Sequence, residues 1–289
     1  MTKLAMKDLK SKVIIVAGGT GGIGCATVRL LSSQGAIVVV ASRKQPPATM
    51  FNNVSVSAFQ GDLGHSQNWD ELVEYVQLKH KHVDALINCV GVLGPDSLET
   101  MSECDVETTM RANFLSVVYG AQAVLPVMRQ QNHGVIVTVG SIGGIVPMPF
   151  ASLYSATKYA VRGFSLSLSQ ELIGTGIHSS LISLGPVHTR MLEAEAAHDR
   201  RIIAFINSPL QPEFVAQSIS SLLLNPKREM VLPRGTGALS ILCNLVPGLF
   251  ALCYRVLQQV GASRLRSYRN EFCTSIPFTN PEAHHVRTS

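Results

Sequence analysis

A tyrosine and a lysine with the spacing needed for proton-transfer chemistry stand at Tyr154 and Lys158. Residues four apart on a helix share a face, so a predicted helix over residues 152–173 places the phenol beside the ammonium group. A neighbouring cation favours the phenolate. We therefore expect Lys158 to lower the pKa of Tyr154 from its usual value of about 10 toward neutrality. A proton donor poised near the working pH is what carbonyl reduction requires.

A glycine-rich loop lies near the start of the chain, directly after an apolar run over residues 13–16. Residues 17–24 read Ala-Gly-Gly-Thr-Gly-Gly-Ile-Gly, and a helix is predicted over 23–34. A strand, a glycine-rich turn and a helix aim free backbone N–H groups at a phosphate, and the glycines let the backbone approach a pyrophosphate. The pattern therefore predicts a dinucleotide site. The alternative is a glycine-rich turn with no ligand.

The residues after the second and third predicted strands bear on the kind of dinucleotide. The second strand ends in Ser42, Arg43 and Lys44. An acidic residue at this place would bind a free ribose 2′-hydroxyl, but the sequence has none there. Hydroxyl and cationic groups suit a 2′-phosphate, so we expect a preference for NADP(H); a solvated basic loop is the alternative. Asp62 follows the third strand. It is expected either to accept from the adenine amino group or to cap the helix that starts near Ser66.

Apolar runs alternate with helical patterns along most of the chain. The runs are short, β-branched and nearly uninterrupted, as strands of a sheet covered on both faces require. Strands are predicted at residues 13–16, 37–40, 54–59, 85–90, 135–139, 180–184 and, more weakly, 229–232. Helices are predicted at 23–34, 67–80, 103–131, 152–173 and 212–224. This alternation predicts an α/β fold: a Rossmann-type doubly wound parallel sheet of about seven strands, flanked by helices, in a single domain.

Composition excludes several classes of protein. The chain has 289 residues, of which 46% are hydrophobic and 15% charged, so it is globular rather than disordered. The net charge of +5 includes no run of like charges, and we expect no nucleic-acid partner. Six scattered cysteines without a Cys-x-x-Cys pair indicate reduced thiols and no metal site. The first residues contain no apolar signal segment, so a cytoplasmic location is expected, with membrane association left open.

An uncharged apolar stretch over residues 237–254 breaks the alternating pattern, and arginines follow it. Its length just reaches that of a membrane span, but Pro247-Gly248 would interrupt a continuous helix. Three alternatives stay open: packing on the protein or a partner subunit, peripheral membrane contact through residues 237–260, and a true span. We divide the chain into a dinucleotide-binding and catalytic domain, 1–233, and a C-terminal extension, 234–289.

As a set, these motifs resemble the short-chain dehydrogenase/reductase family, in its compact single-domain branch, from about Lys12 to Pro233. Residues 17–24 match the family's Thr-Gly-x-x-x-Gly-x-Gly pattern with alanine at the first position, and 88–91 match its Asn-Asn-Ala-Gly motif with cysteine at the second. The family's helix asparagine falls on Asn113, its active-site serine on Ser141, and its Tyr-x-x-x-Lys pair on residues 154 and 158. Its Pro-Gly turn is inverted, as Gly185-Pro186.

The resemblance implies a role for each of these residues. Tyr154 would be the general acid in reduction and the base in oxidation, and Ser141 would hydrogen-bond the substrate oxygen. Lys158 would also hold the nicotinamide ribose, and Asn113 would anchor a water on the proton path. The residues expected to contact the cofactor are Gly18, Thr20, Gly21, Gly22, Ile23, Gly24, Ser42, Arg43, Lys44, Asp62, Leu63, Asn88, Gly91, Tyr154, Lys158, Pro186, Val187 and Thr189.

Residues 189–210 lie where the family places a substrate lid, and they are rich in apolar side chains, as are residues 142–150. An apolar pocket favours a lipophilic substrate; ordinary core packing is the alternative. The expected function is that of an NADP(H)-dependent oxidoreductase that interconverts a lipophilic ketone or aldehyde and its alcohol. An NAD-dependent hydroxysteroid or retinol-type dehydrogenase and a non-catalytic dinucleotide-binding regulator are the alternatives. The resemblance also implies a homodimer or homotetramer.

Overall fold

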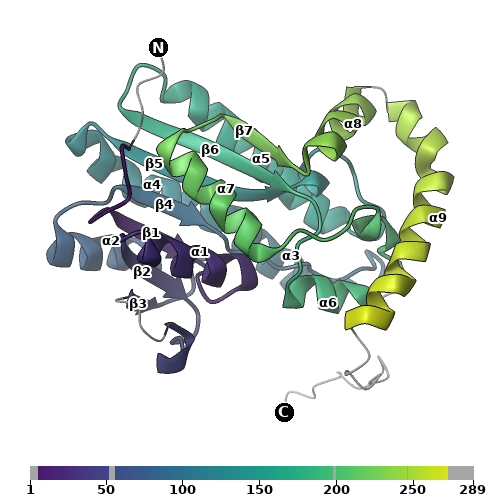
Figure 1. Ribbon diagram of the computed structural model, residues 1–289, viewed down its shortest axis with the longest axis horizontal. Coiled ribbons are helices and arrows are strands. Elements are labelled where there is room, and N and C mark those ends of the chain that lie inside the picture. Colours follow the sequence, from purple (N-terminus) through teal and green to yellow (C-terminus); the bar gives the residue numbers. More distant parts are fainter. Residues whose placement is uncertain (1–5, 52–55, 198–199, 246, 273–289) are drawn as a thin grey trace.

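Seven strands form one sheet in the computed structural model, which describes residues 6–51, 56–197, 200–245 and 247–272. Their order is β3-β2-β1-β4-β5-β6-β7, and every neighbouring pair is parallel (Figure 1). The strands are β1 (Val13–Ala17), β2 (Ile37–Ser42), β3 (Val56–Gln60), β4 (Ala85–Asn88), β5 (Gly134–Ser141), β6 (Ile177–Leu184) and β7 (Glu229–Leu232). The predicted Rossmann-type parallel sheet is confirmed, although residues 54 and 55 of the third predicted strand lie outside the described residues.

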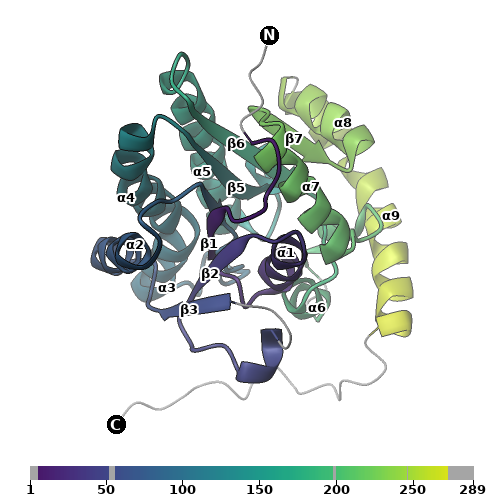
Figure 2. The same ribbon diagram turned by 60° about the vertical axis from the view of Figure 1, so that its left-hand side comes forward.

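Two layers of helices cover the sheet (Figure 2). On one face lie α1 (Gly22–Ser33) and α7 (Pro212–Leu224), and on the other α2 (Ser66–His80), α4 (Ser116–Gln131) and α5 (Ser152–Glu171). Side chains such as Leu31 and Trp69 are fully buried between helices and strands. Burial of each large apolar side chain contributes about 1.5–3 kcal/mol, which explains why short runs of valine and isoleucine form the central strands.

The sheet reverses its strand order between β1 and β4. Ala17 pairs with Asn88 at the ends of these two strands, and the backbone N–H of Cys89 donates to the carbonyl oxygen of Ala17 at 2.9 Å. In open α/β sheets, ligands bind beyond the carboxyl ends of the strands at such a switch point. The glycine-rich loop and residues 88–91 therefore meet where a ligand is expected.

The helix predicted over residues 103–131 is divided into three parts. The first part is α3 (Glu103–Met110), whose N-terminus carries a capping box between Ser102 and Asp105. A π-helical turn, η2 (Arg111–Leu115), separates it from α4. Such turns widen a helix locally and often occur at functional sites. This turn contains the predicted site residue Asn113.

The remaining elements before the C-terminal extension are short. They are the helix α6 (Arg190–Ala196) and the short turns η1 (Ala48–Phe51), η3 (Ile142–Gly144) and η4 (Ile202–Phe205). The C-terminal extension forms α8 (Arg234–Leu245) and α9 (Pro247–Phe272), which run in different directions (Figure 1). The break between α8 and α9 falls at Pro247, where the sequence predicts an interruption.

The C-terminal extension packs onto the domain. Cys243 of α8 is buried against Ile145 and Val146, and Tyr268 of α9 is buried with residues of α6 and η4. Within the ranges that the structure describes, no helix is long and apolar enough to cross a membrane. This packing agrees with the first of the three alternatives for residues 237–254. The expected homodimer or homotetramer and the peripheral membrane contact stay predictions.

The amino edge of the sheet is held by a buried carboxylate. The side chain of Asp84, 2% exposed, precedes β4 and accepts from the backbone N–H of Val13 at 2.8 Å. Lys12, His82 and His133 each place a side-chain nitrogen 3.1 Å from its oxygens. Burial alone would raise the pKa of the Asp84 carboxyl group, but the hydrogen bonds from the Val13 backbone N–H, Lys12 and His133 together lower it.

Candidate active site

The glycine-rich loop turns sharply between β1 and α1. Gly18 has φ = +76°, in the left-handed region that favours glycine, and a Cβ on Gly24 would lie 2.2 Å from the carbonyl oxygen of Gly18. Helix α1 follows with Gly21 as its N-cap, no side-chain cap and no acidic residue in its first turn. The first-turn N–H groups therefore remain available to an anion, as predicted for a pyrophosphate site.

The predicted adenosine end lies at the carboxyl ends of β2 and β3. The hydroxyl of Ser42 donates to the carbonyl oxygen of Lys44 at 2.8 Å, which fixes the turn, and the side chains of Arg43 and Lys44 are exposed to solvent. Asp62 accepts from the backbone N–H of Gly64 at 3.0 Å rather than from the first turn of α2. The Leu63 side chain is buried in the core. A cofactor would therefore meet Leu63 through its backbone.

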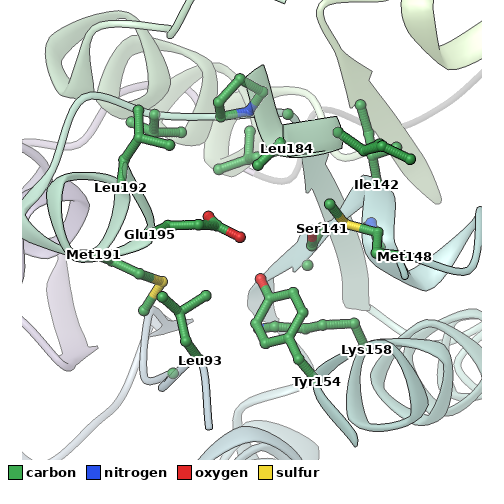
Figure 3. A pocket seen from close by; sticks show the side chains of 18 of the residues that line it. Leu93, Ser141, Ile142, Met148, Tyr154, Lys158, Leu184, Met191, Leu192 and Glu195 are labelled. Atoms are coloured by element: carbon green, nitrogen blue, oxygen red, sulfur yellow. Dashed lines mark hydrogen bonds between the residues drawn. The ribbon is translucent and has the colours of Figure 1, made fainter. Parts of the chain in front are cut away.

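Three of the four predicted catalytic side chains, those of Ser141, Tyr154 and Lys158, line one cavity at the carboxyl edge of the sheet (Figure 3). Ser141 ends β5, and its hydroxyl accepts from the backbone N–H of Gly143 at 3.0 Å. Tyr154 and Lys158 lie one turn apart on α5, with the ammonium nitrogen 5.7 Å from the centre of the phenol ring. Lys158 is buried, and its ammonium lies 3.5 Å from the carbonyl oxygen of Val139. The structure thus brings Ser141, Tyr154 and Lys158 together as expected.

The electrostatics of the Tyr154–Lys158 pair differ from the sequence-based expectation. Burial raises the pKa of Tyr154 to about 12, and this effect exceeds the opposing hydrogen bond with Ser141. Burial also lowers the pKa of Lys158 to about 8. The prediction that Lys158 shifts the Tyr154 pKa toward neutrality is therefore wrong for this geometry, because desolvation of the phenolate outweighs a cation that sits beside the ring. At neutral pH the phenol of Tyr154 is protonated.

Asn113 is fully buried in the π-helical turn. Its side-chain oxygen accepts from the Val92 backbone N–H at 2.7 Å, and its amide donates to the Val92 carbonyl at 2.9 Å and to the Thr157 hydroxyl at 3.0 Å. Both amide protons are thus used to join η2 to α5 and to the segment after β4. Any water at Asn113 would have to bind an oxygen of this residue, and the predicted water anchor stays a prediction.

The other predicted cofactor residues divide into two groups. Ile23, Gly91, Pro186, Val187 and Thr189 line the same cavity as the catalytic side chains. Asn88 does not: its side chain is 2% exposed, without a hydrogen-bond partner among the described residues, and lies beside Gly120 of α4. Only the backbone of Asn88 remains for the cofactor. Its neighbour Gly91 lies close to the side chains of Asn113 and Lys158.

The wall opposite Tyr154 is formed by the predicted lid. Met191, Leu192, Ile203, Ala204 and Ile206 face the cavity from α6, η4 and the residue after it, and Ile142, Val146 and Met148 add to the apolar lining. Ile145 is buried in the core, and Phe150 is 46% exposed. Helix α9 covers the lid from outside, where the hydroxyl of Tyr268 lies 3.1 Å from Nδ1 of His188 and Arg269 donates to the carbonyl of Ala196 at 2.7 Å.

One residue of this wall was not predicted from the sequence. Glu195 of α6 has a side chain that is buried and directed across the cavity toward Ser141 and Tyr154 (Figure 3). Burial raises the pKa of its carboxyl group to about 7, and Arg201 opposes that shift. The only sequence signal is an acidic residue between two alanines in a lid that is otherwise rich in apolar side chains.

The family model for short chain dehydrogenases matches residues 12–200. The chain belongs to the short-chain dehydrogenase family. An uncharacterized oxidoreductase of Staphylococcus saprophyticus is 30% identical over 234 residues, which cover 78% of this short-chain dehydrogenase and 95% of the relative. A 3-ketodihydrosphingosine reductase of Bacteroides thetaiotaomicron is 34% identical over 181 residues, or 63% of this chain and 66% of that protein.

A solved structure gives the same result as the sequence comparisons. The crystal structure of a variant of actinorhodin polyketide ketoreductase with NADPH has a TM-score of 0.72 at 27% identity, and the match covers 78% of this chain and 97% of that chain. Members of the short-chain dehydrogenase family use a nicotinamide dinucleotide. The residues present fit such a group. The first turn of α1 has no side-chain cap and can take the pyrophosphate, and Ile23 of that turn lines the same cavity as Tyr154 and Lys158, so one dinucleotide could reach both places.

Proposed function

We propose that this short-chain dehydrogenase is an NADP(H)-dependent oxidoreductase that interconverts a lipophilic ketone or aldehyde and its alcohol. The observation that carries the proposal is the single cavity in which Ser141, Tyr154 and Lys158 face an apolar lid. The nicotinamide, when bound, supplies or accepts a hydride. The protein supplies the proton, orients the substrate and keeps water out.

Tyr154 is the proton donor in the reducing direction. Its raised pKa keeps the phenol protonated at neutral pH, so a proton is available as negative charge develops on the substrate oxygen. Ser141, at the end of β5, is held by the Gly143 backbone N–H and places its hydroxyl toward the same oxygen. Lys158, one helical turn away and facing Gly91, is positioned for the ribose hydroxyls beside the nicotinamide.

Two features support NADP(H) over NAD(H). Arg43 and Lys44 present exposed cationic side chains at the end of β2, where a 2′-phosphate would lie, and Ser42 holds their turn in place. The crystal structure of the actinorhodin polyketide ketoreductase variant, which this chain resembles, contains NADPH. The lipophilic substrate is supported by the lining, since aliphatic side chains and methionines make up most of the wall around Tyr154.

The test is turnover of a panel of medium- and long-chain ketones and aldehydes, followed as NADPH or NADH consumption. Tyr154→Phe is expected to lower kcat by about a hundredfold to ten-thousandfold, because it removes only the transferable proton, while fluorescence titration shows NADPH binding unchanged. Tyr75→Phe, on the outer helix α2, is the matched control with normal kcat. Preference for NADH would favour the NAD-dependent alternative, and tight NADPH binding without turnover of any carbonyl would favour a regulator.

A further inference from the structure

A buried carboxyl group faces the reacting side chains from the lid. Glu195 is 9% exposed, lines the cavity together with Ser141 and Tyr154, and points into it from α6 (Figure 3). Its neighbours on that wall, Met191 and Leu192, are apolar. The carboxyl group and the phenol are close enough for the charge of Glu195 to raise the pKa of Tyr154.

The described part of the chain gives this carboxyl group no hydrogen bond. Arg201 is the cation that acts on it, but the two residues form no ion pair within 4.0 Å among the described residues. Arg201 is itself buried and donates instead to the carbonyl oxygens of Phe150 at 3.1 Å and Gly94 at 3.0 Å. Glu195 therefore presents free acceptor oxygens to the interior of the cavity.

A buried carboxyl group without a donor costs folding free energy. A substrate that carries a donor can remove this cost when it binds. Ser141 and Tyr154 lie on one side of the cavity and Glu195 on the other (Figure 3). A substrate whose carbonyl oxygen is bound by Ser141 and Tyr154 would therefore have its neighbouring carbons facing Glu195. A donor on one of those carbons would then meet the carboxyl group, while the rest of the substrate contacts the apolar wall.

We infer that Glu195 is a specificity-determining residue, which accepts a hydrogen bond from an ammonium or hydroxyl group that the substrate carries within one or two carbons of the reacting carbonyl. The inference deepens the proposed function and rests on it for the placement of the carbonyl. It narrows the substrate class from lipophilic ketones in general to lipophilic amino ketones or hydroxy ketones.

The inference is tested with three ketones of equal chain length: a plain medium-chain dialkyl ketone, its α-hydroxy derivative and its α-amino derivative. For the wild type, kcat/KM is expected to be about tenfold to hundredfold higher for one of the two derivatives than for the plain ketone. Glu195→Gln keeps an acceptor oxygen without the charge, and Glu195→Leu removes both. An ammonium donor predicts that the preference falls in both variants, whereas a hydroxyl donor predicts that it survives in Gln and is lost in Leu.

The matched control is Glu193→Gln, on the same helix but outside the cavity lining, which is expected to keep the wild-type preference. If Glu195 serves only to balance the charge of Arg201, both Glu195 variants will change kcat/KM for the three ketones by the same factor, and the inference is overturned. A wild type without preference among the three ketones overturns it as well.

Calorimetry separates this inference from the proposed function. The plain secondary alcohol and its amino and hydroxy derivatives are titrated into the wild type and both variants in the presence of NADPH, with which the alcohols cannot exchange a hydride. If the protein turns over none of the ketones but still binds a donor-bearing alcohol about tenfold more tightly through Glu195, the proposed function fails and the inference stands. Equal affinities for all three alcohols contradict the inference whether or not turnover is observed.

Discussion

The carboxyl group of Glu195 and the phenol of Tyr154 face each other from opposite walls of one cavity, the first on the lid helix α6 and the second on α5. Glu195 is buried and Tyr154 is half-buried, and their partial removal from water raises the pKa of both groups. A cavity lined mostly by apolar side chains therefore holds two groups that lose their protons at a higher pH than they would in water. One of them can donate a proton to the substrate, and the other can accept a hydrogen bond from it.

The carboxyl group makes the folded state sensitive to pH. The pKa of Glu195 is raised from 4.5 to about 7 on folding, so the folded chain binds this proton more tightly than the unfolded chain. The protonated carboxyl group therefore adds to the free energy of unfolding; this contribution is fully present below pH 4.5 and is lost as the pH rises through about 7. Glu195→Gln removes this dependence. As the pH rises from about 4 to about 8, the free energy of unfolding of the wild type should fall by about 3 kcal/mol relative to that of Glu195→Gln.

Urea unfolding of both proteins at the two pH values measures this gain. Glu193→Gln, on the same helix, is the control and should show a constant difference from the wild type. A Glu195→Gln variant whose stability runs parallel to that of the wild type would mean that the carboxyl group is solvated in the folded protein.

Much of the fold could be predicted because its signals are local. The central strands are runs of β-branched residues buried on both sides, and the predicted limits of β1 and β5 differ from the observed ones by one or two residues. The convergence of Ser141 and Tyr154 could also be predicted, because a parallel sheet brings the carboxyl ends of its strands to one edge. Neither inference needs a long-range contact.

What could not be predicted depends on contacts between distant segments. The π-helical turn around Asn113 contains no glycine or proline, and its amide bonds to Val92 and Thr157 come from other parts of the chain. The pKa of Tyr154 depends on how much of the phenol is buried, which helical spacing does not reveal. Glu195 reaches the cavity only because α6, far along the chain from Ser141 and Tyr154, packs against it.

Charge reversal at Arg43 tests the choice of cofactor. Arg43→Glu would place a carboxylate where a 2′-phosphate is expected, so KM for NADPH should rise about tenfold to a hundredfold while KM for NADH stays similar or falls. Steady-state kinetics with both cofactors measure the change. Arg129→Glu makes the same charge change in the last turn of α4 and should leave both KM values near those of the wild type. An unchanged KM for NADPH in Arg43→Glu would contradict the preference.

Two glycine substitutions with opposite environments test the phosphate loop. Gly24→Ala would place a methyl group 2.2 Å from the Gly18 carbonyl oxygen, so the loop must shift, and both nucleotide affinity and thermal stability should fall. Gly163→Ala on α5 meets no atom within 4 Å and should stabilise the protein by about 0.5–1 kcal/mol. Thermal unfolding with and without NADPH compares them. Normal NADPH affinity in a folded Gly24→Ala protein would show that the loop is not the phosphate site.

The carboxylate at the amino edge of the sheet should stabilise the protein without affecting turnover. Asp84→Asn removes a buried charge that Lys12, His82 and His133 surround. The free energy of unfolding is expected to fall by about 3 kcal/mol at neutral pH. The pKa of Asp84 is lowered on folding, so its contribution is present above its ordinary pKa and disappears as the pH falls through the lower folded value. Urea unfolding at neutral and acidic pH measures both effects.

Asp70→Asn, on the exposed side of α2, is the control for this prediction and should leave stability within about 0.5 kcal/mol of the wild type. A loss for Asp84→Asn that is equally large at neutral pH and at strongly acidic pH would contradict the electrostatic explanation.

The central claim is that the chain brings a hydride donor and a lipophilic carbonyl together beside Tyr154. The most direct measurement is reduction of a medium-chain ketone with NADPH that carries deuterium at the transferring position, with mass spectrometry of the product alcohol. We predict one deuterium on the carbinol carbon in the wild type and no labelled alcohol from Tyr154→Phe in the same time. Alcohol formed without deuterium, or equal labelled product from both proteins, would contradict the account.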